Sequence, residues 1–403
     1  MLYLGPFNPE DVVRDRLLPA RNPAAYNRMI RLAEALASGG TSVEIVSTGV
    51  ALQMGLGRRI IYRLQTRTVS SCQLTLLPGI GLPLVGFLCE PFIIAAWLIN
   101  RLLFRRPSAL VVYNATIASA VGVVIATVFR VPVVYEVEDI PTLDAVWRAG
   151  RGNRPRLWQI ASFVLASRIQ MWCRPRILVP ARRFLDAILP RWALGQPVAV
   201  IPGCMNVTTA RPALETLIGG TRPLRVLFAG KLEEEHGYDL LVSAIRIIAS
   251  DVKHSLRIEF DICGRFGTSA AERLYKLPDS VSVRLHGFTS DDRYRELLEL
   301  ADLGLALQRT SGVFSGTRTP SKAYEFLASG KLLIGTGVGD LPELFPHGAV
   351  ELVPETAESL AALLIDVSDN PRKYLGIVDT GLAIARSRYS YEAACDSLAP
   401  LLS

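Results

Sequence analysis

Short apolar segments alternate with longer helical patterns along most of the chain, and this alternation constrains the fold more than any other feature. In the first half, strand-like segments lie at residues 2–5, 43–47, 74–77, 110–113, 133–137, 177–180 and 198–201. An amphipathic segment at 23–37 is preceded by Asn22 and followed by Gly39 and Gly40, which are typical helix caps. Alternation of short β-branched strands with helices predicts a parallel, doubly wound α/β sheet.

A second series of the same kind begins after residue 222. Its strand-like segments lie at residues 224–229, 258–263, 281–285, 303–307, 332–334 and 350–353. Residues 206–222, between the two series, show neither pattern, and we expect them to form a linker. Since a chain of 403 residues exceeds the usual size of one hydrophobic core, we predict two domains, at 1–205 and 223–385.

Composition disfavours several classes of protein. Half of the residues are apolar and a fifth are charged, as in a globular protein with substantial cores. The six cysteines form no C-x-x-C pair and the four histidines lack metal-ligand spacing. We therefore expect no disulfide framework, no metal and no cofactor, and a reducing cytoplasm is favoured. Gly79 and Gly81 lack the third glycine of a nicotinamide-binding loop, and no cleavable signal peptide is recognisable.

Charge is divided unevenly between the two halves of the chain. Residues 1–205 hold 23 arginines, no lysine and 11 acidic residues, a net charge of +12, whereas the remainder has a net charge of −5. A basic half beside a mildly acidic half predicts that the basic half meets an anionic partner. We expect no nucleic acid, because no nucleic-acid-binding motif accompanies the arginines, and an anionic membrane surface fits better.

Residues 74–104 are overwhelmingly apolar, and Arg105 and Arg106 follow them directly. We expect Glu90 and the prolines within this stretch to divide it into pieces too short for a transmembrane helix. Trp97, close to these arginines, is typical of a helix that lies at a membrane interface. The alternative is a buried helix of the first domain, and both hold if one face packs while the other contacts lipid.

The segment at residues 311–344 carries the clearest functional pattern. A glycine-spaced loop precedes a helix that begins at Pro320 and Ser321, and a second glycine-rich loop precedes another helix start at Pro342. Helix N-termini behind glycine-rich turns offer clustered backbone N–H groups, an arrangement that suits a phosphate. This pattern favours nucleotide-sugar binding.

Three side chains near these loops suit a nucleoside-diphosphate sugar. Arg318 and Lys322 can pair with a diphosphate, and Glu325 can hold the hydroxyls of a ribose. The order P-S-K-x-x-E-x-L-A-x-G-K-x-x-I, followed by G-V-G-D-L-P-E-L, closely resembles the donor-site signature of GT-B glycosyltransferases, especially the retaining family four (glycosyl transferases group 1). The alternative is an ordinary amphipathic helix and turn of an α/β domain.

The resemblance extends over nearly the whole chain. Segments similar to those of the family occur in the same order at residues 22–47, 201–203, 227–241, 283–307 and 390–402. The resemblance implies the GT-B fold, in which two doubly wound, Rossmann-like domains face a cleft. The first domain would bind the acceptor and face a membrane, and the second would bind the nucleotide sugar. A terminal helix at 386–403 would cross back to the first domain.

The donor site of the family can be carried over residue by residue. The resemblance implies that Glu325 binds the ribose, while basic side chains and loop N–H groups hold the diphosphate. The expected donor-binding residues are Lys231, His236, Thr317, Arg318, Lys322, Glu325, Gly339, Asp340 and Leu341. Lys231 is also expected to be catalytic, because a cation can stabilise the departing phosphate. The alternative is that these are solvated loop and helix residues, with Asp340 only an N-cap.

Two departures from the family pattern concern the sugars. Thr317 stands where relatives have a Glu that contacts the transferred sugar, so either the sugar is bound differently or activity is reduced or absent. Many relatives have a His near Glu138, and this chain has none there. We expect Glu138 and Asp139 to be catalytic groups and Asn114 to contribute to the acceptor site. The alternative is that these strand-end acids pair with nearby arginines.

The leading hypothesis is a cytoplasmic glycosyltransferase, peripheral on the inner face of the plasma membrane. It would move a hexose from a nucleoside-diphosphate sugar to a lipid-linked or polysaccharide acceptor in cell-surface glycan biosynthesis. The resemblance implies a retaining, metal-independent reaction, although a carboxylate base would suit an inverting one. A second hypothesis is a catalytically silent GT-B subunit that binds a partner glycosyltransferase or lipid. A third, a sugar-nucleotide epimerase, is disfavoured by the basic first half.

Overall fold

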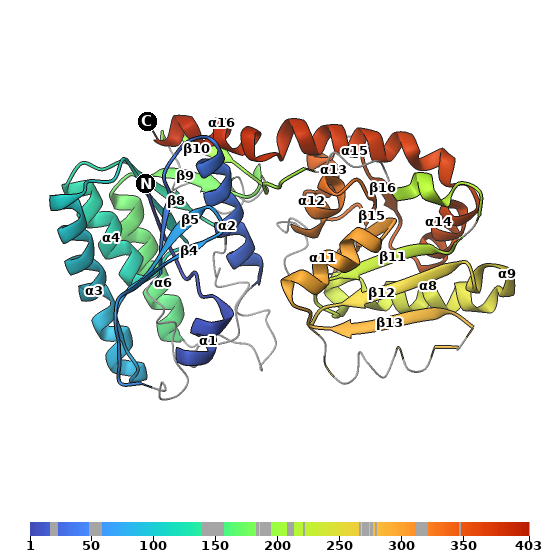
Figure 1. Ribbon diagram of the computed structural model, residues 1–403, viewed down its shortest axis with the longest axis horizontal. Coiled ribbons are helices and arrows are strands. Elements are labelled where there is room, and N and C mark those ends of the chain that lie inside the picture. Colours follow the sequence, from blue (N-terminus) through green and yellow to red (C-terminus); the bar gives the residue numbers. More distant parts are fainter. Residues whose placement is uncertain are drawn as a thin grey trace. The chain divides into compact units, whose positions relative to one another are not determined.

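The computed structural model contains two compact units (Figure 1). Unit 1 comprises Met1–Cys204 and Tyr391–Ser403, and unit 2 comprises Met205–Ser390. The structure describes residues 1–16, 23–47, 59–138, 157–182, 185, 195–207, 213–220, 222–265, 267, 274, 277–278, 280–311, 321–345 and 348–402. Each unit has its own sheet and its own hydrophobic cores.

Unit 1 is built on an eight-stranded sheet with the spatial order β10-β9-β8-β7-β1-β2-β5-β4. Its strands are β1 (Leu2–Leu4), β2 (Glu44–Ser47), β4 (Gln65–Val69), β5 (Cys72–Leu76), β7 (Leu110–Tyr113), β8 (Val133–Glu136), β9 (Arg176–Val179) and β10 (Val198–Val200). Every pair in this sheet is parallel except that of β4 with β5. The predicted strand segments of the first half all coincide with strands of this sheet, which confirms the doubly wound arrangement.

The edge strand β4 was not expected from the sequence. Its side chains, QTRTV, are exposed or half-buried, so they show none of the apolar alternation that marks a strand with one buried face. Ser70, with a φ of 52°, turns the chain into β5, where Leu74 and Leu76 are buried. A separate ribbon pairs β3 (Ile61–Tyr62) antiparallel with β6 (Gly79–Ile80). Polar edge strands of this kind escape a search for hydrophobic periodicity.

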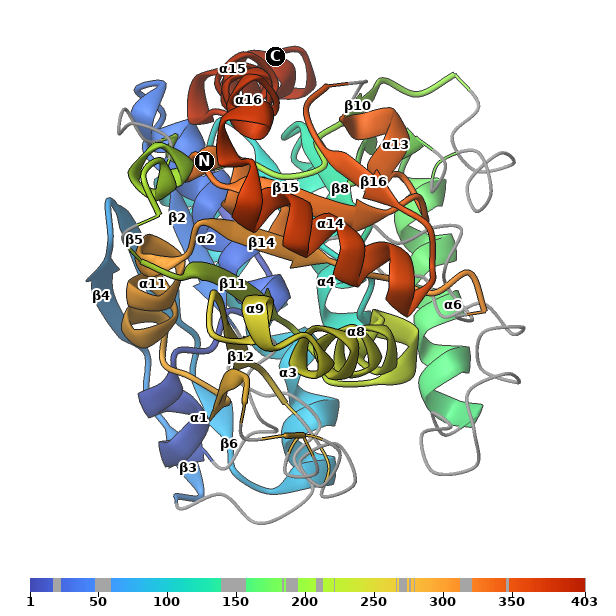
Figure 2. The same cartoon turned by 90° about the vertical axis from the view of Figure 1, so that its right-hand side faces the viewer.

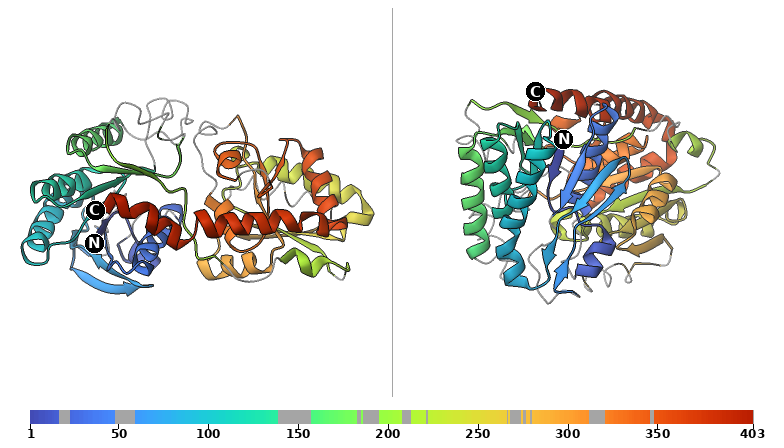
Figure 3. Two further views of the ribbon diagram at one scale, coloured as in Figure 1. Left: turned by 90° about the horizontal axis from the view of Figure 1, so that it is seen from above. Right: turned by 60° about the vertical axis from the view of Figure 1, so that its left-hand side comes forward.

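Helices cover both faces of the sheet of unit 1 (Figures 1 and 3). One layer consists of α1 (Glu10–Arg16), α2 (Pro23–Ser38) and the C-terminal α16 (Tyr391–Leu402). The other layer consists of α3 (Pro83–Phe104), α4 (Ile117–Val128) and α6 (Leu157–Trp172), which lie side by side. Helix α16 packs against α2, and Tyr391 donates a hydrogen bond to the Glu34 carboxylate at 2.6 Å.

We expected prolines and Glu90 to divide residues 74–104, and this expectation is wrong for residues 83–104. Helix α3 runs unbroken for 22 residues, with Pro91 inside it. A proline inside a helix costs about 3 kcal/mol or more, but burial of Ile94, Leu98 and Leu102 in the core beside α4 offsets that cost. Residues Val85–Phe104 of α3 are therefore long and apolar enough to cross a membrane, by length and composition alone.

Unit 2 is built on a six-stranded parallel sheet with the spatial order β13-β12-β11-β14-β15-β16. Its strands are β11 (Leu224–Ala229), β12 (Ile258–Cys263), β13 (Ser282–Gly287), β14 (Leu303–Ala306), β15 (Leu332–Thr336) and β16 (Glu351–Val353). Each of the predicted strand segments of the second half overlaps one of these strands. The second doubly wound sheet is therefore confirmed.

Helices also cover both faces of the sheet of unit 2 (Figure 2). One core contains α8 (Tyr238–Ser250), α14 (Ala357–Asp369) and the short turns η1 (Ala213–Leu217) and η3 (Pro371–Tyr374). The other contains α11 (Asp291–Leu300), α12 (Ser321–Ala328), α13 (Leu341–Leu344) and α15 (Leu375–Arg388). The short helix α9 (Val252–Ser255) follows α8.

The segment expected to be a linker, 206–222, is partly integrated into unit 2. Leu214 and Leu217, on η1, are buried in its core, because this turn covers apolar side chains that would otherwise face water. At the other end of the chain, the expected terminal helix at 386–403 comprises the last three residues of α15, which belongs to unit 2, and the helix α16, which belongs to unit 1. The break falls at Tyr389, whose carbonyl oxygen accepts the Met205 N–H at 2.8 Å.

Candidate functional site

The predicted donor site lies at the carboxyl ends of the strands of unit 2. Ligands of doubly wound sheets bind at this edge, beside the point where the strand order reverses, which here is between β11 and β14. The loops that leave β11 and β12 begin with Gly230 and Gly264. A Cβ atom on Gly264, whose φ is 144°, would lie 1.6 Å from the Gly230 carbonyl oxygen. Only glycine therefore allows these two loops to approach each other.

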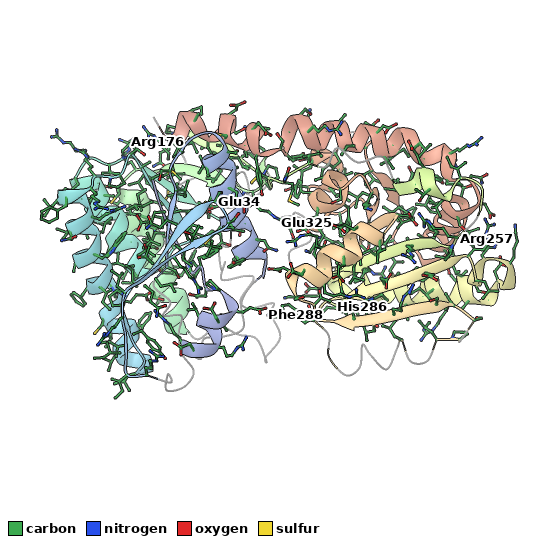
Figure 4. The ribbon with its side chains drawn as sticks, viewed as in Figure 1. Glu34, Arg176, Arg257, His286, Phe288 and Glu325 are labelled. Carbon is green, nitrogen blue, oxygen red and sulfur yellow. The ribbon has the colours of Figure 1, made fainter. Side chains whose placement is uncertain are left out.

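Lys322, which is half-buried, and Glu325, which is buried, form an ion pair on α12. The Lys322 Nζ atom donates to the Glu325 Oε2 atom at 2.9 Å, and Glu325 is only 2% exposed. The Lys322 ammonium also lies 3.8 Å from the centre of the Tyr294 ring, in a cation–π contact. Figure 4 shows Glu325 on this helix. The alternative of an exposed helix Glu is wrong for Glu325, whose buried charge is compensated by Lys322.

The last residue of β12 locates this pair over the strand ends. Burial raises the pKa of the Cys263 thiol to about 11, and the charges of Lys322, Asp261 and Glu325 also act on it. Cys263 also packs in the same buried cluster as Ala323 and Tyr324 of α12. Cys263 is the final residue of its strand, so the Lys322–Glu325 pair belongs to the edge at which a ligand is expected.

The loop after β15 leads into α13 through Gly339, whose φ is 65°. Asp340 occupies the N-cap position and is 2% exposed, yet its side chain makes no hydrogen bond that caps the described helix α13. Its backbone carbonyl accepts from the N–H groups of Glu343 and Leu344 at 3.0 and 2.9 Å. Leu341 packs in the core. The structure therefore does not support a side-chain N-cap as the reason for an Asp at this position.

The loop after β11 holds the two remaining described donor residues. Lys231 is exposed, whereas His236 is half-buried at the end of the turn η2 (Glu234–His236). Gly237 follows with a φ of 70°, and a Cβ atom there would lie 2.5 Å from the Cβ atom of Leu307, just beyond β14. The loop after β11 thus packs directly on the start of the loop after β14, at the point where the strand order reverses.

Arg309 is a cation of this edge that the sequence analysis did not include. Its guanidinium pairs with the Asp239 carboxylate and donates to the Glu355 carbonyl oxygen at 2.9 Å, and its backbone N–H donates to the Glu235 carbonyl oxygen at 3.1 Å. It thereby joins the loops that follow β11, β14 and β16. Its position just beyond a strand end is the sequence feature from which Arg309 could have been predicted. No comparable feature marks Tyr294, whose ring contacts Lys322.

Three of the predicted site residues, Thr317, Arg318 and Asp139, lie outside the described residues. The other predicted donor residues belong to α12, to the start of α13 or to the loops that follow β11 and β15, and Lys322 and Glu325 are in direct contact. Within the described ranges, no group of three or more His, Cys, Asp or Glu side chains is arranged to hold a metal ion.

In unit 1, Glu138 lies just beyond the end of β8 in a network of polar side chains. Its carboxylate is 2.8 Å from the Nε atom of Arg28, on α2, and accepts a hydrogen bond from the Tyr113 hydroxyl. Its backbone N–H donates to the Asn114 Oδ1 atom at 2.8 Å. The structure thus brings Glu138 and Asn114 together, and Glu138 pairs with an arginine, as the alternative interpretation holds.

Arg28 is the centre of this network. Its Nε atom donates to the Glu136 Oε1 atom at 2.6 Å, and its Nη atoms donate to the carbonyl oxygens of Ile201 and Pro202 at 2.9 and 3.0 Å. Glu136 is completely buried. Burial acts to lower the pKa of Arg28, but Glu136 and Glu138 together raise it well above its usual value. The network therefore fixes two chain segments at the strand ends of unit 1 against α2.

Residues 223–370, within unit 2, match the family model described as glycosyl transferases group 1. The amylovoran biosynthesis glycosyltransferase AmsK of Erwinia amylovora is 26% identical to this chain over 186 residues. That match covers 45% of this chain and 45% of AmsK, so it spans about half the length of the curated relative.

Two solved structures resemble the chain over nearly its whole length. Sucrose-phosphate synthase from Thermosynechococcus elongatus has a TM-score of 0.63 at 15% identity, covering 99% of this chain and 97% of the synthase. HepE from Anabaena, determined in complex with UDP-glucose, has a TM-score of 0.63 at 14% identity, covering 100% of this chain and 98% of HepE. At such identities the likeness concerns the fold. The two doubly wound units are those of a GT-B protein, as predicted.

Proposed function

We propose, because residues 223–370 match the family model of glycosyl transferases group 1, that the protein is a glycosyltransferase that takes a hexose from a nucleoside-diphosphate sugar. The observation that carries this proposal is the Lys322–Glu325 pair, a buried carboxylate and a cation at the strand-end edge where doubly wound sheets bind ligands. Two relatives agree with it, since AmsK is named for amylovoran biosynthesis and HepE was determined with UDP-glucose.

In the proposed donor complex, Glu325 accepts hydrogen bonds from the ribose hydroxyls. An ammonium has three N–H donors, so Lys322 can keep its bond to Glu325 and still bind a phosphate oxygen. Lys231 and His236, on the loop after β11, add positive charge beside the diphosphate, His236 only when an anion favours its protonated form. Backbone N–H groups and side chains at residues 339–341 contact the sugar and the phosphate from the loop after β15.

The reaction that we assign to this site is transfer without a metal ion. Lys231 stabilises the charge that develops on the departing phosphate, as a preorganised cation does in phosphate-releasing enzymes. Arg318 adds to that stabilisation, and Thr317 contacts the transferred sugar in place of the carboxylate found in relatives. We propose retention of configuration, with the leaving phosphate assisting attack on the same face of the sugar.

Unit 1 is proposed to bind the acceptor, a lipid-linked glycan or a polysaccharide of the cell surface. Asn114, Glu138 and Asp139 would contact the acceptor hydroxyl. The Glu138 carboxylate is already engaged in the ion pair with Arg28, so it is better placed to orient a hydroxyl than to leave that pair and remove a proton. This argument supports a retaining reaction over an inverting one. We place the enzyme in the cytoplasm, peripheral on the inner face of the plasma membrane.

A second candidate is a catalytically silent GT-B subunit that binds a partner glycosyltransferase or a lipid. The observation that favours it is Thr317, which stands where the family resemblance implies a carboxylate that contacts the sugar. Such a subunit can bind a nucleotide sugar, but it would not consume it.

A thermal-shift series with UDP, GDP and ADP and their sugar conjugates tests the proposal. We expect one nucleoside diphosphate to stabilise the protein, by about 2.7 kcal/mol at a hundred times its dissociation constant. The stabilising donor is then incubated with a membrane lipid extract and with polysaccharide, and sugar transfer is measured. Donor binding without transfer or hydrolysis would favour the silent subunit, and no binding by any of the three nucleotides would exclude the enzyme.

A further inference from the structure

One face of α3 carries a row of exposed apolar side chains. They are spaced three, four or seven residues apart, so they share one side of the helix. We call this set the apolar stripe, and it consists of Val85, Leu88, Phe92, Ile99 and Leu103. The exposed fractions of these side chains reach 75% at Phe92. The helix is therefore apolar on the face that packs in the core and on the face that does not, which a helix of a water-exposed surface rarely is.

Arginines stand near both ends of the apolar stripe. Arg105 and Arg106 follow the last residue of α3 and are exposed. Near the first residue, Arg59 and Arg63 flank β3 and are also exposed. The partner strand of β3 is β6, which directly precedes α3 and contacts it. Ile61, on β3, is 68% exposed and adds an apolar side chain at that end. The stripe is thus an apolar surface with positive charge at its two ends.

We propose that the apolar stripe lies along the surface of a bilayer that contains anionic phospholipids, with these arginines on the lipid phosphates. This proposal rests on the proposed function, because a lipid-linked acceptor is the reason for the enzyme to be at a membrane. Apolar side chains gain free energy when they enter the boundary between headgroups and acyl chains. Each arginine near an anionic surface adds to that attraction. The net charge of +12 in residues 1–205 acts in the same direction.

A bilayer fits this surface better than a second copy of the chain. In a dimer formed through the apolar stripe, the two copies of α3 could lie parallel or antiparallel. Both arrangements would bring arginines of the two copies together, because both ends of the stripe are positive. Like charges at such a contact repel, whereas lipid phosphates neutralise them. Glu90 is the one acidic residue of α3, and it is half-buried, so it does not reverse the charge of the surface.

The helix lies at the bilayer surface and does not cross it. Its other face, with Ile94, Leu98 and Leu102, is buried in the core of unit 1. Arg101, near its end, is 2.5 Å from the Glu44 carboxylate on β2. A crossing would remove these side chains from the core and break that ion pair. The interfacial position leaves the fold intact and buries only the side of the helix that water now contacts.

Sedimentation of the full-length protein with vesicles tests the proposal. We expect binding to vesicles made of equal parts phosphatidylcholine and phosphatidylglycerol, and much weaker binding to phosphatidylcholine alone. The double substitution Arg105→Gln and Arg106→Gln should weaken binding by about tenfold or more, since each cation near the surface contributes on the order of a fivefold factor. Leu88→Gln should weaken binding about fivefold, because it removes one inserted side chain.

Leu165→Gln is the matched control. Leu165 lies on α6 of the same unit and is 54% exposed, whereas Leu88 is 56% exposed, but it is not part of the apolar stripe. We expect Leu165→Gln to leave vesicle binding unchanged. Equal losses in Leu88→Gln and Leu165→Gln would overturn the assignment of the stripe, and equal binding to both kinds of vesicle would overturn the role of the arginines.

Two further measurements distinguish this proposal from a dimer interface and from the proposed donor site. Sedimentation equilibrium without vesicles reports the oligomeric state. If the protein bound no vesicles but formed a dimer, and Phe92→Gln dissociated that dimer, the apolar stripe would be a contact between two copies of the chain. Calorimetry with the nucleoside diphosphate reports the donor site. Vesicle binding without nucleotide binding would defeat the proposed function alone, and nucleotide binding without vesicle binding would defeat the membrane proposal alone.

Discussion

The strand ends of both units hold a carboxylate paired with a cation, but the two pairs are built differently. In unit 1, Arg28 joins Glu136 and Glu138 to two backbone carbonyls, and it therefore ties α2 to two other chain segments. In unit 2, Lys322 and Glu325 belong to one helix, and the Lys322 side chain is 28% exposed. The first arrangement is part of the fold. In the second, the Lys322 ammonium is partly in solvent, so it can keep its bond to Glu325 and still bind a ligand.

The largest effect should come from removing the cation of unit 1. Arg28→Ala leaves Glu136 buried without its ion pair, which we expect to lower the free energy of unfolding by about 3–5 kcal/mol. Urea denaturation measures this loss. Arg28→Lys keeps the charge but not the fork of N–H donors, so it should lose less stability than the alanine variant and still fold.

Arg67→Ala is the control for this prediction. Arg67 also pairs with a carboxylate of unit 1, that of Asp11, but the Asp11 side chain is 63% exposed and that of Arg67 is 34% exposed. An exposed pair of this kind contributes about 0–1 kcal/mol. If Arg67→Ala lowered stability as much as Arg28→Ala, the network around Arg28 would not be the structural centre that we describe.

The next effect concerns the pair in unit 2. Glu325→Gln and Lys322→Ala should each weaken binding of the nucleoside diphosphate by about ten- to a hundredfold, since a hydrogen bond to a charged group contributes about 1.5–3 kcal/mol. Isothermal titration calorimetry measures the change. The control is Lys373→Ala, which removes a lysine that pairs with Asp366 away from the strand ends of unit 2. Unchanged affinity in both site variants would defeat the assignment of the donor site.

Glu138→Gln tests whether Glu138 of unit 1 contacts the acceptor or only stabilises the fold. The amide keeps the shape of the side chain but loses the ion pair with Arg28, so we expect a loss of about 1–3 kcal/mol in stability. If Glu138 also orients the acceptor, the KM for the acceptor should rise while the affinity for the donor stays constant. A loss of stability with normal acceptor kinetics would reduce Glu138 to a structural role.

The smallest effect is a pH dependence confined to unit 2, which contains all four histidines. The His254 ring lies 2.6 Å from Asp251 and 3.0 Å from Asp369. The hydrogen bond to Asp251 raises the pKa of His254, while the pKa values of both aspartates are lowered by their hydrogen bonds to His254. A raised histidine pKa stabilises the folded state below the unfolded value of about 6.5, and this contribution disappears as pH rises through the folded value.

Unit 2 should therefore lose stability as the pH rises above about 6.5, whereas the aspartates lose their contribution only in acid, below about 3.9. Differential scanning calorimetry between pH 6 and pH 8 should show a fall of about 1–2 °C in the unfolding temperature of unit 2. His254→Gln should abolish that fall. A fall that persists in the variant would assign it to another group.

The sequence predicted those parts of the molecule whose signal is local. The apolar strand segments of both series recur as strands because a strand buried on both faces must be apolar along its length. The capped helix with Lys322 and Glu325 was equally visible, because a proline start and a glycine stop are chemical features of neighbouring residues. The polar edge strand β4 was missed, since nothing buried marks it.

The charged network of unit 1 could not be predicted in the same way. Arg28 and Glu136 are 108 positions apart, and only the parallel sheet and the helix upon it bring them together. The continuity of α3 was misjudged for a related reason. Pro91 disfavours a helix locally, but the side chains that outweigh it act through contacts with α4, which a local pattern does not contain.

Composition and spacing alone predict two doubly wound sheets, an uneven division of charge and a nucleotide-binding signature at residues 311–344. These properties can be read from residue types and their spacing, and they do not depend on contacts between distant segments. Which charges are buried depends on the folded chain, in which Glu325 is a carboxylate compensated by Lys322 and Glu138 is part of the network around Arg28. The folded chain also determines which face of α3 meets water. Burial depends on contacts between distant segments, and it is burial that sets the cost of a charge and the value of an exposed apolar side chain.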